Sequence, residues 1–406
     1  MKRAVLQLGA GPIQRALLGE IARLGLVPIV VDRSERPQGL VPGAIHLRAP
    51  IDDADAILAA LRDRPRELEP VAVLTSTDLG VASVPRVAHA LGLPHASAES
   101  VAVMNDKLEA KRRLARTGVR VPQGEVLGRG DALPEGREAV EWIVKPVDSS
   151  GSRGVRRVRG RAAVEEAIAS AFGFSERVLV EECIEGRHYD VNGLVREGRF
   201  ELVAVGHRFF SKPPACVPLY GGILAQPDPA LEARITALMQ RAVEAFDYRH
   251  GAIKADLIED ARGPVLIEAA ARFHGDVFSD HTMRAAGLAP AAIHWLARSG
   301  AVALPEPIRR TGAWLAIFPR AAGTIEAIRG LDGLRAHTGF REWIPRLGRG
   351  DRVGAPDDNR ALVGYGIVEL AEDGDVWSGL ERLRRSISVV LREEGAGIRS
   401  PGASVA

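Results

Sequence analysis

Two acidic side chains, Asp256 and Glu268, stand in apolar segments that are typical of neighbouring strands, residues 251–260 and 264–272. If a hairpin closes between these segments, the two carboxylates lie side by side. A buried carboxylate on an apolar strand needs a cation partner, and Mg²⁺ prefers carboxylate oxygens together with phosphate and water. The pair therefore predicts a magnesium site that serves phosphate chemistry. Two solvent-facing acids are the alternative interpretation.

A lysine and a loop of small residues follow, at the end of a strand predicted over residues 141–147. The lysine is Lys145, and the loop consists of Ser149, Ser150, Gly151, Ser152, Arg153 and Gly154. Exposed backbone N–H groups and hydroxyls suit phosphate oxygens, and the lysine adds a point charge. The lysine precedes the loop, so the order differs from that of a P-loop. Taken alone, the segment also fits a solvated hairpin.

Three alanines separate Glu268 from Arg272. On a strand, Glu268, Ala270 and Arg272 share one face, while Ala269 and Ala271 share the other. We expect the methyl groups of the second face to pack beneath a helix. Ala270 lies on the charged face and has no atom that can bind a metal ion.

The elements that must position these groups fall into three patterns. In the first, apolar runs at 4–12, 27–32 and 70–78 alternate with helical patterns at 13–26, 53–64 and 81–94, which predicts a small parallel-sheet domain. A charged helix over 105–119 then leads into a region of predicted antiparallel strands. The last pattern has strands at 312–320 and 360–370 and a closing helix over 378–395.

A glycine-rich turn follows the first strand. Gly9 and Gly11, with Asp32 at the end of the second strand, imitate a dinucleotide-binding fingerprint, but Gln14 holds the third glycine position. We expect these glycines to serve a tight strand-to-helix crossing. A nicotinamide oxidoreductase stays an alternative.

Composition narrows the class of protein. The 406 residues are 46% hydrophobic and 26% charged, with a formal net charge of +2, which gives no general attraction to nucleic acid or to membranes. The two cysteines, Cys183 and Cys216, are too few for a disulfide framework, and no apolar run approaches the roughly 18 residues of a membrane span. We expect a cytoplasmic protein with small-molecule partners, and a homodimer stays open.

The charged motifs occur in a fixed order: Lys107 in MNDKLEAK, Lys145 with its loop, VLVEECIEGRHYDV, Asp256, and then Glu268 with Arg272. In this order they resemble the ATP-grasp superfamily, in particular carboxylate–amine ligases such as L-amino acid ligases, over nearly the whole chain. The resemblance implies an α/β and α+β fold. Its parts are a Rossmann-like pre-grasp domain (1–100), an ATP-grasp domain of two lobes (101–300) with a hinge near 181–186, a C-terminal α+β ligase-associated domain (301–395) and a disordered tail (396–406).

The resemblance also implies how ATP and metal are held. Lys107 and Lys145 would hold the α- and β-phosphates, and the loop 149–154 would close over the β- and γ-phosphates. Asp256 and Glu268 would hold Mg²⁺, with two ions expected.

The hinge would hold the nucleoside. The Glu181 side chain would take the adenine amino group, and the backbone of Cys183 and Ile184 would contact the ring edge. Many members of the superfamily carry an acid for the ribose hydroxyls where this chain has His188, so either His188 or Glu185 would take that role.

The same resemblance implies the chemistry. A substrate carboxylate would be phosphorylated by ATP and attacked by an amine, with Arg272 stabilising the acyl phosphate. ATP-grasp enzymes commonly show Glu-x-Asn-x-Arg here, whereas the Glu-x-Ala-x-Arg form of this chain favours the amino-acid ligase branch. Candidate substrate contacts are His207, Tyr220, His274 and Asp276.

Two further readings share the nucleotide residues. A carboxylating ATP-grasp enzyme would use bicarbonate to carboxylate an amine, and a nucleotide sensor would bind ATP without turnover. Sequence names neither the acid nor the amine.

Overall fold

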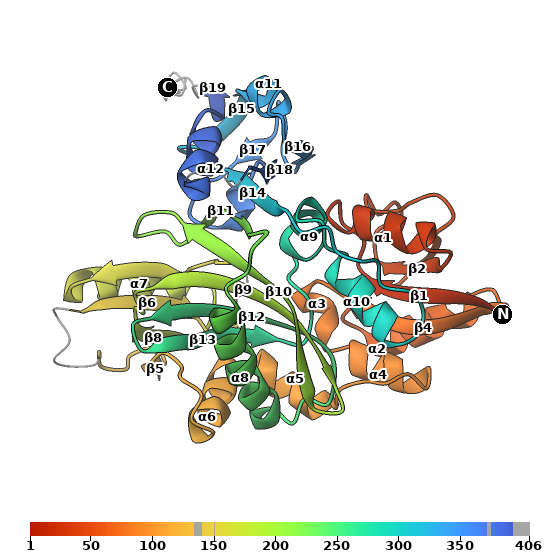
Figure 1. The fold of residues 1–406 in the computed structure, drawn as a ribbon. Coiled ribbons are helices and arrows are strands. Elements are labelled where there is room, and N and C mark those ends of the chain that lie inside the picture. The colour runs from red at the N-terminus through yellow and green to blue at the C-terminus, as the bar shows by residue number, and fades with distance from the viewer. Residues whose placement is uncertain (134–139, 150, 372–374, 393–406) are drawn as a thin grey trace, which may run out of the picture.

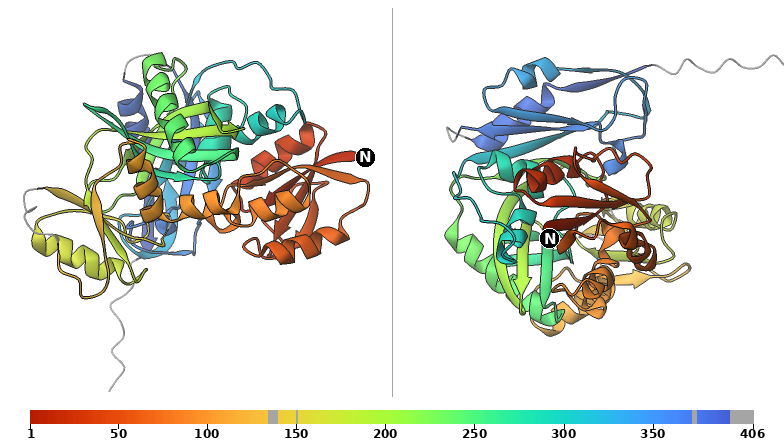
Figure 2. Two further views of the ribbon diagram at one scale, coloured as in Figure 1. Left: turned by 90° about the horizontal axis from the view of Figure 1, so that it is seen from below. Right: turned by 90° about the vertical axis from the view of Figure 1, so that its right-hand side faces the viewer.

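Residues 1–133, 140–149, 151–371 and 375–392 are described by the structure, which is a computed structural model. An N-terminal domain, a central region and a C-terminal domain follow one another along the chain (Figures 1 and 2). The predicted disordered tail, 396–406, lies outside the described residues. In the part of the chain that the structure describes, no helix is long and apolar enough to cross a membrane.

The N-terminal domain is built on a parallel sheet in the order β3-β2-β1-β4, as the alternation of patterns predicts. Its strands are β1 (Lys2–Leu8), β2 (Val27–Asp32), β3 (Ile45–Arg48) and β4 (Leu68–Thr75). Its helices are α1 (Gln14–Arg23), α2 (Ala54–Ala60), η1 (Leu61–Asp63), α3 (Asp78–Val81) and α4 (Val84–Ala90).

The glycine turn after β1 is filled by the chain itself. Gly9 has a φ of +87°, which suits the sharp crossing into α1. The Asp32 carboxylate accepts the Ala10 N–H at 3.0 Å, and the Gly39 N–H donates to the Ala10 carbonyl at 2.9 Å. A Cβ at Gly39 would lie 2.3 Å from the Gly11 carbonyl oxygen. The acid that would hold a ribose in an oxidoreductase is therefore engaged with the turn, which favours the structural interpretation.

The predicted charged helix over 105–119 is confirmed as α6 (Lys107–Arg116). A separate helix, α5 (Ala98–Asn105), precedes it, and the two helices meet at Asp106. The Asp106 side chain accepts the N–H groups of Leu108 and Glu109 at 2.9 and 3.0 Å, so it caps a new helix. Lys107 consequently stands at the first position of α6.

A small antiparallel sheet in the order β5-β8-β6-β7 forms one lobe of the central region. Its elements are β5 (Gly124–Leu127), β6 (Glu141–Pro146), β7 (Arg156–Arg159), α7 (Arg161–Ala171) and β8 (Val178–Glu182). The loop from Ser149 to Gly154 joins β6 to β7, and the chain leaves β8 at the predicted hinge.

The larger lobe belongs to an eight-stranded sheet in the order β13-β12-β9-β10-β11-β14-β18-β16. The strands of this lobe are β9 (Arg187–Arg196), β10 (Arg199–Phe210), β11 (Pro218–Ile223), β12 (His250–Asp260) and β13 (Gly263–Ala270). Helix α8 (Pro229–Ala245) packs against β10 and β13. Ala269 and Ala271 lie in the apolar core that this helix covers, as the alternation on the strand predicts.

Short helical segments connect this lobe to the C-terminal domain. They are η2 (Phe278–Thr282), α9 (Met283–Ala285) and α10 (Ala291–Arg298). Strand β14 (Thr311–Ile317) then pairs with β11, so the large sheet continues across residue 300 into the C-terminal domain.

The C-terminal domain adds β16 (Phe340–Pro345), β18 (Gly364–Leu370), α11 (Leu331–Arg335) and η3 (Asn359–Ala361). The domain also contains a three-stranded sheet in the order β17-β15-β19. Its strands are β15 (Gly323–Arg329), β17 (Arg352–Val353) and β19 (Ser388–Arg392). The predicted closing helix over 378–395 is wrong in its second half, because α12 (Val376–Arg385) ends before β19 begins. The β-branched Val389 and Val390 suit a strand better than a helix.

The hinge after β8 lies closely against β12. A Cβ at Gly186 would meet the Glu259 carbonyl oxygen at 2.2 Å and the Ile258 side chain at 2.8 Å. We predict that Gly186→Ala lowers the free energy of unfolding by about 1–3 kcal/mol, because the backbone must shift to admit the methyl group. Gly19→Ala is the control, since α1 leaves open space at Gly19 and the change should stabilise the helix by about 0.5–1 kcal/mol. Chemical denaturation of both variants measures these changes, and equal stabilities would contradict the packing at the hinge.

Candidate active site

A cavity of about 570 Å³ lies between the two lobes and extends to the C-terminal domain, which contributes Asn359 and Tyr365 to its wall. Most residues predicted for the site line it together. They are Lys107, Lys145, Ser149, Gly151, Ser152, Glu181, Cys183, Ile184, His188, Asp256, Glu268, Arg272, His274 and Asp276. The fold therefore brings the separate motifs into one place. Ser150 lies outside the described residues.

Lys107 reaches the start of the Ser/Gly loop. Its Nζ donates to the carbonyl oxygens of Val147 and Ser149, each at 2.9 Å. Asn359 of the C-terminal domain donates its N–H to the Gly151 carbonyl at 3.4 Å. Within the described residues the buried Ser149 hydroxyl has no hydrogen-bond partner, so it can serve a ligand in the cavity. The loop is thus held at its start by Lys107 and at Gly151 by the C-terminal domain, and it offers the Ser149 hydroxyl to a ligand.

Lys145 is paired with Glu181, which the sequence alone did not indicate. The buried Glu181 carboxylate accepts Lys145 Nζ at 2.5 Å and Lys111 Nζ at 2.6 Å. Burial alone would raise the pKa of Glu181, but the charges of the two lysines outweigh it and hold the pKa below its usual value. In this structure Glu181 therefore neutralises two lysines, Lys111 and Lys145. An adenine amino group would have to share its carboxylate oxygens.

At the hinge, the Cys183 N–H donates to the Glu141 carbonyl at 3.0 Å. The adenine edge would therefore meet the Cys183 carbonyl and the Ile184 backbone. His188 faces the cavity and contacts the Phe210 ring, with the centroids 4.8 Å apart, whereas the Glu185 side chain is 82% exposed and lies 3.5 Å from Arg157. Of the two candidates for the ribose, His188 has the better position.

The acid pair lies as predicted, and a lysine joins it. Asp256 and Glu268 are register partners on β12 and β13. Lys254 Nζ lies between them, 2.9 Å from Asp256 Oδ2 and 3.0 Å from Glu268 Oε1. The charge of Lys254 lowers the pKa of Glu268 to about 2 against the effect of burial. Lys254 is two residues before Asp256, so the period of the strand could have placed it on the same face.

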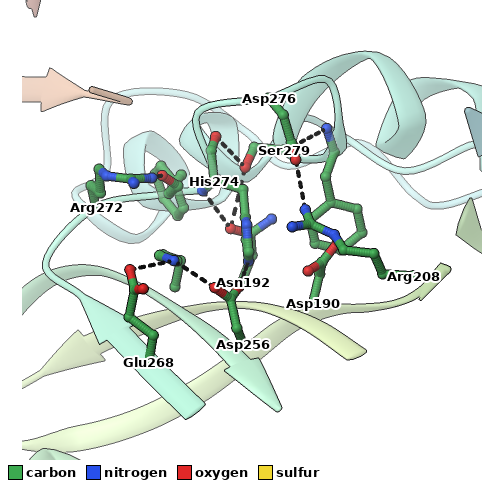
Figure 3. A network of polar contacts seen from close by, with 12 residues as sticks. Asp190, Asn192, Arg208, Asp256, Glu268, Arg272, His274, Asp276 and Ser279 are labelled. Atoms are coloured by element: carbon green, nitrogen blue, oxygen red, sulfur yellow. Dashed lines mark hydrogen bonds and ion pairs between the residues drawn. The ribbon is translucent and has the colours of Figure 1, made fainter. Parts of the chain in front are cut away.

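Further charged side chains lie beside the acid pair, on β9 and β10. Asp190 is the register partner of Asp256 on β9, and Arg208 bridges Asp190 and Asp276 at 2.7 and 2.6 Å (Figure 3). Burial raises the pKa of Asp190 well above its usual value although Arg208 opposes the shift. His274 lies over Asp256 in the same view. Sequence reasoning missed both Asp190 and Arg208, although it had selected the segments that contain them.

Arg272 is held by the N-terminal domain. Its Nη2 and Nε lie 2.6 and 2.7 Å from Asp78 Oδ1, and its Nη1 donates to the Phe273 carbonyl at 2.8 Å. Asp78 begins α3, in a domain that sequence had assigned no part in the site. The guanidinium is therefore fixed at the cavity wall by a contact between domains.

Three residues predicted for the site lie elsewhere in the structure. The described wall of the cavity does not include His207, Tyr220 or Gly154. His207 alternates with Arg208 on β10 and contacts Trp377, with the ring centroids 5.0 Å apart. Tyr220 pairs with Phe209 in the register of β10 and β11 and its ring stacks on the Phe209 ring, and neither residue belongs to the described wall of the cavity. Gly154 has a φ of +72°, and a Cβ there would lie 2.8 Å from the Pro146 side chain, so this glycine serves the packing of the loop.

Comparison with known proteins agrees with this geometry. The family model of the ATP-grasp domain matches residues 104–276, and that of the L-amino acid ligase C-terminal domain 2 matches residues 315–392. The central region of the chain therefore contains an ATP-grasp domain. Carboxylate–amine ligases are among the relatives of the chain.

The protein is 35% identical to a D-alanine–D-alanine ligase of Sodalis glossinidius over 27% of this chain and 32% of that one. In further curated relatives the match spans 47%, 59% and 61% of their length, and 75% in one at 28% identity. The chain thus spans less than two thirds of most of them.

Solved structures share the fold over nearly the whole chain. An L-amino acid ligase from Bacillus licheniformis superposes with a TM-score of 0.79 at 19% identity, covering 97% of this chain and 99% of that one. N5-carboxyaminoimidazole synthetase from Staphylococcus aureus, solved with ADP, gives a TM-score of 0.70 at 14% identity over 95% and 98%. At these identities the likeness shows the fold alone.

The lysine pair around Glu181 gives a first prediction for the site. Lys111→Ala should lower the free energy of unfolding by about 1–3 kcal/mol, because it leaves the buried carboxylate with one partner. Arg113→Ala on the same helix is the control, since its ion pair with the exposed Glu99 should contribute less than about 1 kcal/mol. Urea unfolding of both variants measures the difference. Equal losses would show that Glu181 does not need Lys111.

The protonation of His207 gives a second prediction, which concerns the stability of the fold. Burial, with Arg187 nearby, lowers the pKa of His207 to about 4. Between pH 4 and about 6.5 the unfolded chain therefore binds a proton that the folded chain does not, so the free energy of unfolding rises with pH across this window. The contribution of one histidine is at most about 1.4 kcal/mol per pH unit. His207→Phe should flatten the pH profile of stability below pH 6.5 and leave it parallel to that of the wild type above about pH 7. Parallel profiles throughout would contradict the buried, neutral imidazole.

Proposed function

We propose that this protein is an ATP-dependent ligase that joins a carboxylate to an amine, with an amino acid as one substrate. The observation that carries the proposal is one cavity in which Lys107, Lys145, a Ser/Gly loop, an acid pair and a buried arginine meet. Groups of this kind neutralise a transferring phosphoryl group and fix its position. The match to the L-amino acid ligase C-terminal domain supports the amide-forming branch.

The substrate carboxylate would attack the γ-phosphorus of ATP, forming an acyl phosphate and releasing ADP. The amine would then attack the acyl carbon, the C–N bond would form, and phosphate would leave. Lys107 and Lys145 would hold the α- and β-phosphates, and the loop from Ser149 to Gly154 would cover the β- and γ-phosphates. Arg272 presents a planar guanidinium that matches the paired oxygens of the acyl phosphate.

The acid pair fits Mg²⁺ in its donor set. Asp256 and Glu268 are register partners and supply carboxylate oxygens, the donors that Mg²⁺ prefers. Bound there, Mg²⁺ supplies positive charge to the phosphate oxygens. Lys254 already lies between the two carboxylates and provides one positive charge of its own.

Hydroxylamine trapping tests the proposal. Incubation with ATP, Mg²⁺, hydroxylamine and each member of a set of amino acids should yield a hydroxamate with the correct acid, because hydroxylamine intercepts an acyl phosphate. Turnover that depends on bicarbonate, without a hydroxamate from any acid, would instead favour the carboxylating alternative. ATP binding without any turnover would favour a sensor.

Arg272→Lys provides the sharpest variant. We predict that hydroxamate formation falls at least tenfold, equivalent to about 1.4 kcal/mol of barrier, because an ammonium cannot reproduce the paired donors that Asp78 orients. The affinity for ATP should not change. Arg298→Lys is the matched control, since Arg298 pairs with Glu201 outside this cavity. A normal rate in Arg272→Lys would exclude Arg272 from the reaction.

A further inference from the structure

Asp190, Asp256 and His274 meet on the wall of the cavity, beside the acid pair. Each offers one ligand atom, and these atoms all lie within 4.8 Å of one another. Asp190 and His274 are almost fully buried, at 1% and 4% exposure. All three residues also line the cavity, so a solute can reach them.

Two of these atoms lack partners. Among the described residues, neither Asp256 Oδ1 nor His274 Nε2 has a hydrogen bond, although both are buried. They face each other at 3.8 Å, which is too long for a direct hydrogen bond. A buried polar atom without a partner is costly, so the site calls for a group that binds both.

The other contacts of the two carboxylates leave this side open. Asp190 Oδ2 accepts Arg208, and Asp256 Oδ2 accepts Lys254, so each carboxylate is held from one side by a base. Asn192 Oδ1 accepts the His274 N–H at 3.2 Å and thereby fixes the backbone of the histidine. The arrangement is oriented before any ligand binds.

The charges around the group favour a cation. The two bases are linked by ion pairs to four carboxylates, those of Asp190, Asp256, Glu268 and Asp276. Carboxylates therefore outnumber bases here, and a bound cation would offset the excess of negative charge.

We propose that Asp190, Asp256 and His274 form a binding site for a divalent transition-metal ion of the Mn²⁺, Co²⁺ or Zn²⁺ class. An imidazole nitrogen with two carboxylates suits such ions, whereas Mg²⁺ takes oxygen ligands. With bonds of roughly 2.1 Å, two ligand atoms on one ion lie about 3–4 Å apart. The 3.8 Å between Asp256 Oδ1 and His274 Nε2 falls within this range.

This site differs from the position expected for Mg²⁺. The Mg²⁺ position lies between Asp256 and Glu268, where Lys254 Nζ approaches both carboxylates. The proposed site lies on the other side of Asp256, which would serve both positions through different oxygens. The inference does not depend on ligase activity.

Pulsed electron paramagnetic resonance tests the proposal directly. The full-length protein is stripped with a chelator, supplied with excess Mg²⁺ to fill oxygen-only positions, and titrated with Mn²⁺ without nucleotide. We expect one bound Mn²⁺ with a ¹⁴N coupling from imidazole. His274→Gln should abolish the coupling and weaken binding at least about tenfold, the loss seen even for residues that only support a ligand.

Matched variants separate the alternatives. His294→Gln is the control, because in the described structure the His294 Nε2 is also buried without a partner but lies outside this cavity. Glu268→Gln should retain the ¹⁴N coupling, since Glu268 belongs only to the Mg²⁺ position. If His274→Gln does not fold, Asp190→Asn should keep the coupling and bind Mn²⁺ more weakly. Absence of the coupling in the wild type, its survival in His274→Gln, or its loss in Glu268→Gln would overturn the proposal.

Discussion

A row of three carboxylates crosses the large sheet, and the closeness of their charges constrains the rest of the site. Asp190, Asp256 and Glu268 are register partners on β9, β12 and β13. Adjacent negative charges on apolar strands are unfavourable unless cations compensate them. Lys254 on β12 and Arg208 on β10 supply that compensation. The positions of these bases therefore follow the row of acids.

The nucleotide end of the cavity has the opposite charge balance. Lys111 and Lys145 share the single carboxylate of Glu181, and Lys107 contacts the start of the Ser/Gly loop, which leaves an excess of positive charge there. Such an excess suits a polyanion. The cavity therefore changes sign along its length, from basic at the loop to acidic at the row of carboxylates. Arg272, neutralised by Asp78, lies at the acidic end.

The sequence predicted the groups that lie on regular strands better than those set by contacts between elements. Closing of a hairpin correctly placed Glu268 beside Asp256, and period-two alternation correctly placed the methyl groups of Ala269 and Ala271 in the core. Tyr220 was proposed as a substrate contact without an argument for its strand face, and the register pairs it with Phe209. Asp78 and Lys111 were missed because only tertiary packing brings them to Arg272 and Glu181. Helix α8 was also missed, although Asp228 caps it and Pro229 occupies its first turn.

The pairing of β11 with β14 has a mechanical consequence. Because one sheet runs from the larger lobe into the C-terminal domain, these two bodies are joined by backbone hydrogen bonds along whole strands. The smaller lobe is attached instead through the hinge near Gly186 and through the ends of its loops. Opening of the cavity is therefore expected to move the smaller lobe, while the larger lobe and the C-terminal domain stay together. Cleavage between α10 and β14 would not release a C-terminal domain that is stable by itself. Its separation from β11 would expose the edge of β14, and exposed strand edges promote aggregation.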